Sequence, residues 1–203
     1  MLFIWLRPST TLVFMIHRLS SFLSLILVLL LAAPAVARDN QEMSLTDTVL
    51  TVSQDHLLLF TTLTNPLTDE QVQGLHNGID IKIIFYIELN QVQAIRGDKN
   101  LSTLEIEHTL SYNTLKQEYR LERSNQAGRA FVLPELDMTL QAAGNLSNIR
   151  VIELNQLAGS SSYRLRLKAV IAKKQLPMNL HYLTNLFPWG DRETDWQTVE
   201  FTY

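Results

Sequence analysis

The chain has 203 residues, 46% of them hydrophobic, and contains no cysteine, which excludes disulfide-linked partners, thiolate zinc sites and cysteine nucleophiles. Of its 17 Lys and Arg residues only Arg7 and Arg18 precede residue 38, where no acidic residue stands, so the rest of the chain carries 15 basic against 20 acidic residues. This acidic balance argues against a general affinity for nucleic acid or for anionic lipid.

The first 37 residues have the features of a signal peptide. An apolar run over Phe22–Ala33 leads to the small-x-small sequence Ala35-Val36-Ala37, so we expect cleavage between Ala37 and Arg38. The run is shorter than the ~20 residues that cross a bilayer core. The remainder, residues 38–203, is predicted to form a single β-rich domain.

The start of translation has an alternative. Met15 begins a well-proportioned signal peptide by itself, while the residues from Met1 to Phe14 add a second apolar stretch. With either start we expect a periplasmic or secreted protein, which would be tethered to the membrane if the N-terminus were not cleaved.

From Ser44 onward the sequence alternates between apolar and polar residues, as strands with one buried face do. The alternation is clearest in three segments: Ile79–Leu89, Leu104–Tyr112 and Tyr163–Ile171. Weaker strands are predicted over residues 45–52, 57–63, 118–122, 149–154 and 197–203.

Two short helices are predicted between these strands. Thr68 is suited to be an N-cap, with Gln71 at the reciprocal capping-box position, and Asn77-Gly78 suits the C-terminal end. The second helix, Glu135–Ala143, follows Pro134. Antiparallel strands with two helices predict a mainly β, sandwich-like fold, with a single-sheet α+β layer as the alternative.

One segment resembles a known family. Residues 110–121, Leu-Ser-Tyr-Asn-Thr-Leu-Lys-Gln-Glu-Tyr-Arg-Leu, are similar to a Leu-x-Tyr-x-x-Leu-x-x-x-Tyr-Arg-Leu segment of the uncharacterised proteobacterial exported family called domain of unknown function 4390. The family also has a tryptophan-bearing tail similar to residues 183–203, in which Trp189 and Trp196 would correspond. The likeness extends over most of residues 43–203.

The resemblance implies no catalytic residue, because the family has no established activity. Its genes often neighbour those of a membrane sensor kinase. This implies an envelope or membrane protein, such as a sensor kinase, as a partner.

The histidines are weak candidates for chemistry. His108 lies on the apolar face of its predicted strand, where it would be either a pH-sensitive base or a hydrogen-bonded histidine at the sheet edge. The sequence shows no HxxxH or HxH pair among His56, His76 and His181, and zinc needs three or four converging ligands. We therefore expect no metal and no cofactor.

Four glutamates would share one outer face if the strands around residues 104–112 and 118–122 formed a hairpin: Glu105, Glu107, Glu118 and Glu122. Paired carboxylates can hydrolyse glycosides when a cleft holds them at a fixed separation. A solvated, salt-bridged surface with Arg120 and Lys116 is the alternative that we favour.

The basic stripe, Arg164, Arg166 and Lys168, occupies the polar face of a predicted strand. It is a candidate surface for an acidic partner or for lipid headgroups. Cross-strand pairing with the glutamate strands is the alternative.

Four aromatic residues are candidates either for a partner-binding surface or for the core: Tyr112, Tyr119, Trp189 and Trp196. Together with the basic stripe they lead us to expect a periplasmic binding or interaction module without catalytic activity. The alternative is a carrier of a small apolar ligand or lipid between sheet and helices, suggested by the apolar segments 57–63 and 79–89.

Overall fold

The computed structural model describes residues 42–126, 128–173 and 190–203. All of these residues belong to one compact unit. Among them, no helix has both the length and the apolar character that crossing a bilayer requires.

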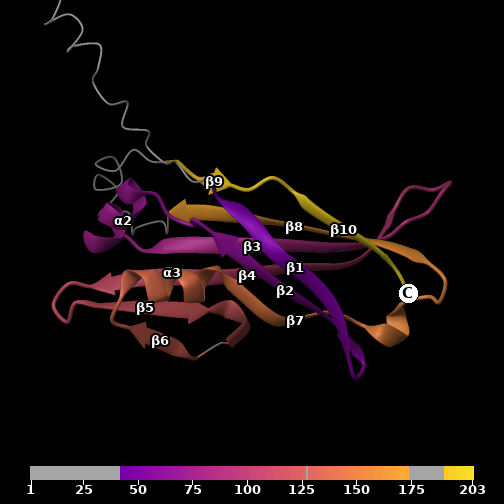
Figure 1. The fold of residues 1–203 in the computed structure, drawn as a ribbon, viewed down its shortest axis with the longest axis horizontal. Coiled ribbons are helices and arrows are strands. Elements are labelled where there is room, and N and C mark those ends of the chain that lie inside the picture. The colour runs from indigo at the N-terminus through magenta and orange to yellow at the C-terminus, as the bar shows by residue number, and fades with distance from the viewer. Residues whose placement is uncertain (1–41, 127, 174–189) are drawn as a thin grey trace, which may run out of the picture. The chain divides into compact units, whose positions relative to one another are not determined.

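Two antiparallel sheets form the described unit, which confirms the mainly β fold with two short helices (Figure 1). The smaller sheet has three strands in the order β1 (Ser44–Ser53), β2 (His56–Thr64) and β7 (Asn145–Glu153). The larger sheet runs β10 (Gln197–Thr202), β8 (Ser162–Lys173), β3 (Ile81–Gln91), β4 (Lys99–Asn113), β5 (Glu118–Arg123) and β6 (Ala130–Leu133). The short strand β9 (Arg192–Glu193) pairs with β8.

The alternation of apolar and polar residues along the strands decides which face of the larger sheet is buried. The odd-numbered residues of β3 from Ile81 to Leu89 and of β8 from Tyr163 to Ile171 are almost completely buried, whereas the even-numbered ones between them are half-buried. β3 pairs with β8 so that Phe85 faces Ala169 and Tyr86 faces Lys168. The same register therefore builds one apolar face and one open, mixed face.

The smaller sheet and both helices cover the apolar face. Side chains of both sheets join in one core cluster, in which Leu59 of β2 and Phe85 of β3 are almost fully buried. Ser102 Oγ donates a hydrogen bond to the Val151 carbonyl oxygen at 2.8 Å, which ties β4 to β7. Figure 1 shows β1 and β2 running obliquely across the strands of the larger sheet. Apolar burial between the layers is the main force that holds them together.

The helix α2 (Asp69–His76) begins as the sequence predicts. Thr68 and Gln71 form the reciprocal capping box, and the chain leaves the helix through Asn77 to Gly78, which has a φ of +84°. Capping satisfies backbone groups that an eight-residue helix cannot satisfy internally.

The helix α3 (Leu136–Gly144) ends differently. It has no C-terminal loop, because Asn145 begins β7 directly. A Cβ at residue 144 would collide with the Leu63 carbonyl oxygen, so the glycine is needed for the close approach of this helix end to β2.

The alternation of apolar and polar residues did not predict every strand or strand boundary. The strands β6 and β9 are too short to show an alternation, and all of Ala130, Phe131 and Val132 are exposed. β4 and β7 begin several residues earlier than predicted. In both cases the added residues pair across the sheet, which is a tertiary effect.

Candidate functional site

The predicted site residues fall into separate places. The basic stripe lies on the open face of β8, and the two tyrosines lie between β5 and α2 at the other end of the strand order. Trp196 joins the stripe rather than the tyrosines. Trp189 and the predicted cleavage site at Ala37 and Arg38 lie outside the described residues.

Arg164 is held by two carboxylates. Its Nη1 lies 2.5 Å from Asp98 Oδ2, and its Nε lies 2.8 Å from Glu200 Oε1. The hydrogen bond that Arg164 donates to Glu200 and the charges of both carboxylates raise the pKa of the guanidinium. Arg164 thus links the β3–β4 hairpin to β10 through its Nε and Nη1 groups.

The tryptophan patch consists of Trp196, Arg166, Lys168 and Tyr86. Arg166 Cζ lies 4.5 Å and Lys168 Nζ 5.3 Å from the centre of the Trp196 ring, so both cations interact with its π face. Lys168 faces Tyr86 directly across the β3–β8 pair. The patch therefore brings two cations and two aromatic side chains together on the open face.

The counter-ions of the stripe differ from the prediction. Arg166 pairs with Glu88 at 3.8 Å, and Lys168 pairs with Glu193 at 2.8 Å. The glutamates of β4 and β5 cannot be the counter-ions of the stripe, because β3 lies between β8 and β4. With Asp98 and Glu200 on Arg164, four carboxylates lie close to the three bases of the stripe, which weakens its general attraction for acidic partners.

Tyr112 and Tyr119 are cross-strand partners in the β4–β5 hairpin, with ring centres 4.8 Å apart. The Tyr119 hydroxyl lies 2.6 Å from His76 Nε2 at the end of α2, and burial, followed by the charge on Tyr112, raises the pKa of Tyr119. Tyr119 is buried and Tyr112 is half-buried. This pair fastens α2 to the sheet, which is a core role.

His108 is buried in the centre of the larger sheet, between β3 and β5, so the prediction of a histidine at the sheet edge was wrong. Its Nδ1 donates to the Ala143 carbonyl oxygen at 2.7 Å, and its ring lies edge-on to Phe85 at 5.4 Å. Burial lowers the pKa of His108 to about 4, although the bond to Ala143 opposes the shift. The neutral ring acts as a cap for the last turn of α3.

Arg123 caps the same helix end. Its Nη2 donates to the Ala142 carbonyl oxygen at 2.6 Å, and its guanidinium lies 5.1 Å from the Phe131 ring centre. Burial lowers the pKa of this guanidinium. Two donors thus satisfy carbonyls that a helix end leaves without partners.

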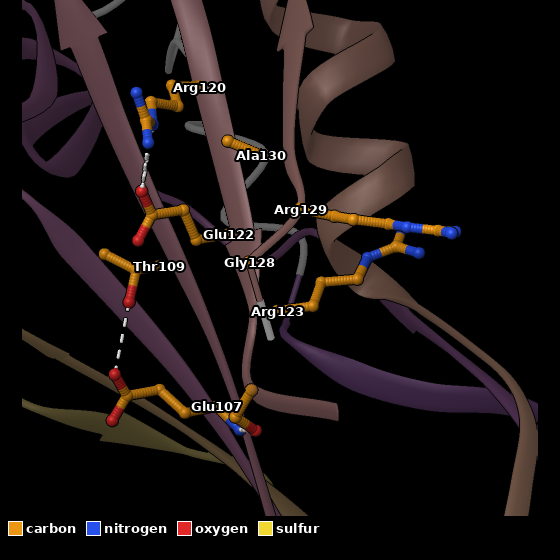
Figure 2. A pocket seen from close by; sticks show the side chains of 9 residues that line it. Glu107, Thr109, Arg120, Glu122, Arg123, Gly128, Arg129 and Ala130 are labelled. Carbon is orange, nitrogen blue, oxygen red and sulfur yellow. Dashed lines mark hydrogen bonds and ion pairs between the residues drawn. The ribbon is translucent and has the colours of Figure 1, made fainter. Parts of the chain in front are cut away.

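The four predicted glutamates do share the open face, as the β4–β5 register shows. Glu107 and Glu122 line a surface pocket of about 340 Å³ (Figure 2). Lys82 holds Glu107 at 2.8 Å and Arg120 holds Glu122 at 2.7 Å. In Figure 2 the side chains of Arg123 and Arg129 point away from these carboxylates, so the charged groups do not converge on one point.

Several residues at these sites were not foreseen. Glu88 and Glu193 become counter-ions only through strand pairing, and Asp98 only through the path of the β3–β4 hairpin. His76 meets Tyr119 only because α2 packs against β4, the strand next to β5. The apolar–polar alternation indicated that Glu88 faces solvent, but no local sequence pattern predicted that it pairs with Arg166. Within the described ranges no three His, Asp or Glu side chains gather closely enough to hold a metal ion.

Comparison with protein families gives one result. Residues 40–200 match the model of a family described as "Domain of unknown function (DUF4390)". Comparisons with curated proteins and with solved structures find no match.

Proposed function

The chain belongs to the DUF4390 family, which has no assigned function, and we propose that it is an exported interaction module without catalytic activity that binds a partner protein through its tryptophan patch. The single observation that carries this proposal is the stacking of Arg166 and Lys168 on Trp196 in an open face of the larger sheet. Tryptophan, tyrosine and arginine are the residues that most often dominate binding energy at protein interfaces.

The patch is held in place before a partner arrives. Glu88 pairs with Arg166 and Glu193 with Lys168. Trp196 directly precedes Gln197, the first residue of β10, which pairs with β8. Ordered side chains lose less conformational entropy on binding, which raises affinity for a given contact area.

The charge balance of the patch indicates what kind of partner it fits. Arg166 and Lys168 are each neutralised by a nearby carboxylate, so net positive charge does not select the partner. Aromatic contact and hydrogen bonds from the two cations would select the partner instead. Such contacts suit a folded protein surface better than a lipid headgroup. The predicted signal peptide supports an envelope location, and a membrane protein such as a sensor kinase is the partner class we favour.

The packing of the core weighs against a ligand carrier. The apolar residues of β3 and β8 that would line such a site are at most 1% exposed and belong to one continuous cluster with the smaller sheet. A hydrolase is disfavoured as well, because Glu107 and Glu122 are both bound by cations on an open surface.

Crosslinking in intact cells tests the proposal. A photoreactive amino acid in place of the exposed Thr198, which pairs with Arg166 across β8 and β10, would capture a protein bound to the patch. Trp196→Ala and Arg166→Glu should each reduce capture by about thirtyfold, the effect of losing a 2 kcal/mol hot spot. Arg150→Glu, on the smaller sheet, is the matched control and should capture as the parent does.

Two results would contradict the proposal. Capture that both patch variants leave unchanged would show that the partner binds elsewhere. The absence of any specific captured protein would remove the interaction function itself. Circular dichroism of the purified variants would verify that they remain folded.

A further inference from the structure

The strand β6 forms an edge of the larger sheet. Within the described residues it pairs only with β5, in an uninterrupted register from Tyr119 opposite Leu133 to Glu122 opposite Ala130. An edge strand presents unpaired N–H and C=O groups along its outer side, ready to pair with another strand. The edge is short, since Pro134 lacks a backbone N–H group and ends it.

One edge strand of the smaller sheet, β1, is built differently. In β1 the pairing register shifts between Thr46 and Val49, and Asp47 has a φ of +51°. Such a bulge twists an edge and hinders addition of a further strand. β6 has no corresponding interruption.

Apolar side chains flank the β6 edge on both faces of the sheet. Phe131, 37% exposed, lies on the core side opposite Leu121, and Val132, 56% exposed, lies on the open side opposite Arg120. Met138 of α3, the helix that packs beside β6, is 48% exposed. A strand added at this edge would cover apolar surface on either side of its backbone.

Opposite charges stand at equal distances from the middle of this edge. Arg129 is three residues before Val132, and Glu135 is three residues after it. Both side chains are exposed, and neither has an ion pair within the part of the chain that the structure describes. Glu135 is the N-cap residue of α3 but makes no side-chain capping bond.

We propose that β6 pairs antiparallel with β6 of a second copy of this chain, with the two Val132 residues facing each other on a two-fold axis. In this register Arg129 of each copy faces Glu135 of the other, because both are three residues from the axis. Arg129 and Glu135 lie just beyond the two ends of β6, and the backbone of Glu135 is still extended, so the same register brings the two charges together on one face at each end of the paired segment. A two-fold interface needs a surface complementary to itself, and the spacing of these charges meets that condition.

The resulting dimer would be weak and sensitive to salt. A four-residue strand with one adjacent helix buries less than a standard interface of about 1,600 Å². We therefore expect a dissociation constant in roughly the micromolar range or weaker. The two ion pairs lie at the rim of the interface, where added salt screens them.

Sedimentation velocity of the full chain, as cells process it, tests the dimer over concentrations that bracket the micromolar range. Arg129→Glu and Glu135→Arg should each weaken dimerisation by about tenfold or more, since each variant creates two like-charge pairs. The double variant R129E/E135R should return the dissociation constant to within about threefold of the parent value, because it restores opposite charges in the same register.

Two more variants separate edge pairing from a general charge effect. Val132→Lys places two like charges on the axis and should abolish the dimer. Arg96→Glu changes the charge of the exposed β3–β4 hairpin by the same amount as Arg129→Glu and should leave dimerisation unchanged.

A chain that stays monomeric at every concentration would overturn the proposal, and so would a double variant that dimerises no better than either single one. Neither result bears on the tryptophan patch, which lies on other strands of the sheet. Circular dichroism would establish that each variant is folded before its dimerisation is compared.

Discussion

Both faces of the larger sheet carry hydrogen-bonded basic residues, but those on the core face are shielded from water and those on the open face are not. On the core face, His108 and Arg123 each donate to a carbonyl at the end of α3. On the open face, Arg164 and Lys168 pair with carboxylates that water also reaches. Because a lost partner costs far more where water cannot replace it, the core face decides stability, and the open face is free to serve binding.

The neighbouring aromatics of β3 give the largest test of this difference. Phe85→Ala should reduce the free energy of unfolding by about 3–5 kcal/mol, because it removes a buried ring and leaves a cavity. Tyr86→Ala, one residue along and on the open face, should cost about 1 kcal/mol or less through lost cross-strand contacts. Urea unfolding of both variants measures the comparison, and equal losses would refute the distinction between the faces.

The pH dependence of stability is the next largest effect. Burial lowers the pKa of His108 from 6.5 to about 4, so below pH 6.5 the unfolded chain binds a proton that the folded chain does not. Stability should therefore be complete above about pH 6.5 and fall as the pH drops toward 4, by about 3 kcal/mol in total.

Neighbouring groups define the control for this prediction. Arg123 also faces His108 across β4 and β5, and its charge further lowers the pKa of the histidine. In His108→Gln the loss of stability between pH 6.5 and 4 should shrink by most of that 3 kcal/mol, because glutamine does not titrate. An unchanged pH profile, measured by urea unfolding, would place the titration on another group.

These tests also mark what could be predicted from the sequence. The periodicity of β3 and β8 and the Thr68–Gln71 capping box are local patterns, and the structure confirms them. The interaction partners of His108 and Arg166 could not be predicted, because they lie on α3 and β3, at positions distant in the sequence. The polarity of the open face was foreseen, whereas its neutralisation depends on the strand order β10-β8-β3-β4.

The smallest expected effect belongs to the open face itself. Arg164→Ala removes the contacts to Asp98 and Glu200, both of them solvent-accessible ion pairs. We expect a slightly lower melting temperature at low salt and no difference from the parent in ~1 M salt, where the Debye length is about 3 Å.

A large, salt-independent loss in Arg164→Ala would mean that this arginine is part of the folding core. A small, screened loss would mean that the ion pairs around the stripe contribute little to stability. Their remaining consequence would then be to order the side chains beside Trp196, since Glu88 and Glu193 pair with Arg166 and Lys168 in the same way. Substitutions in the tryptophan patch could then be assigned to binding, because their effects on partner capture would not be explained by a loss of folded protein.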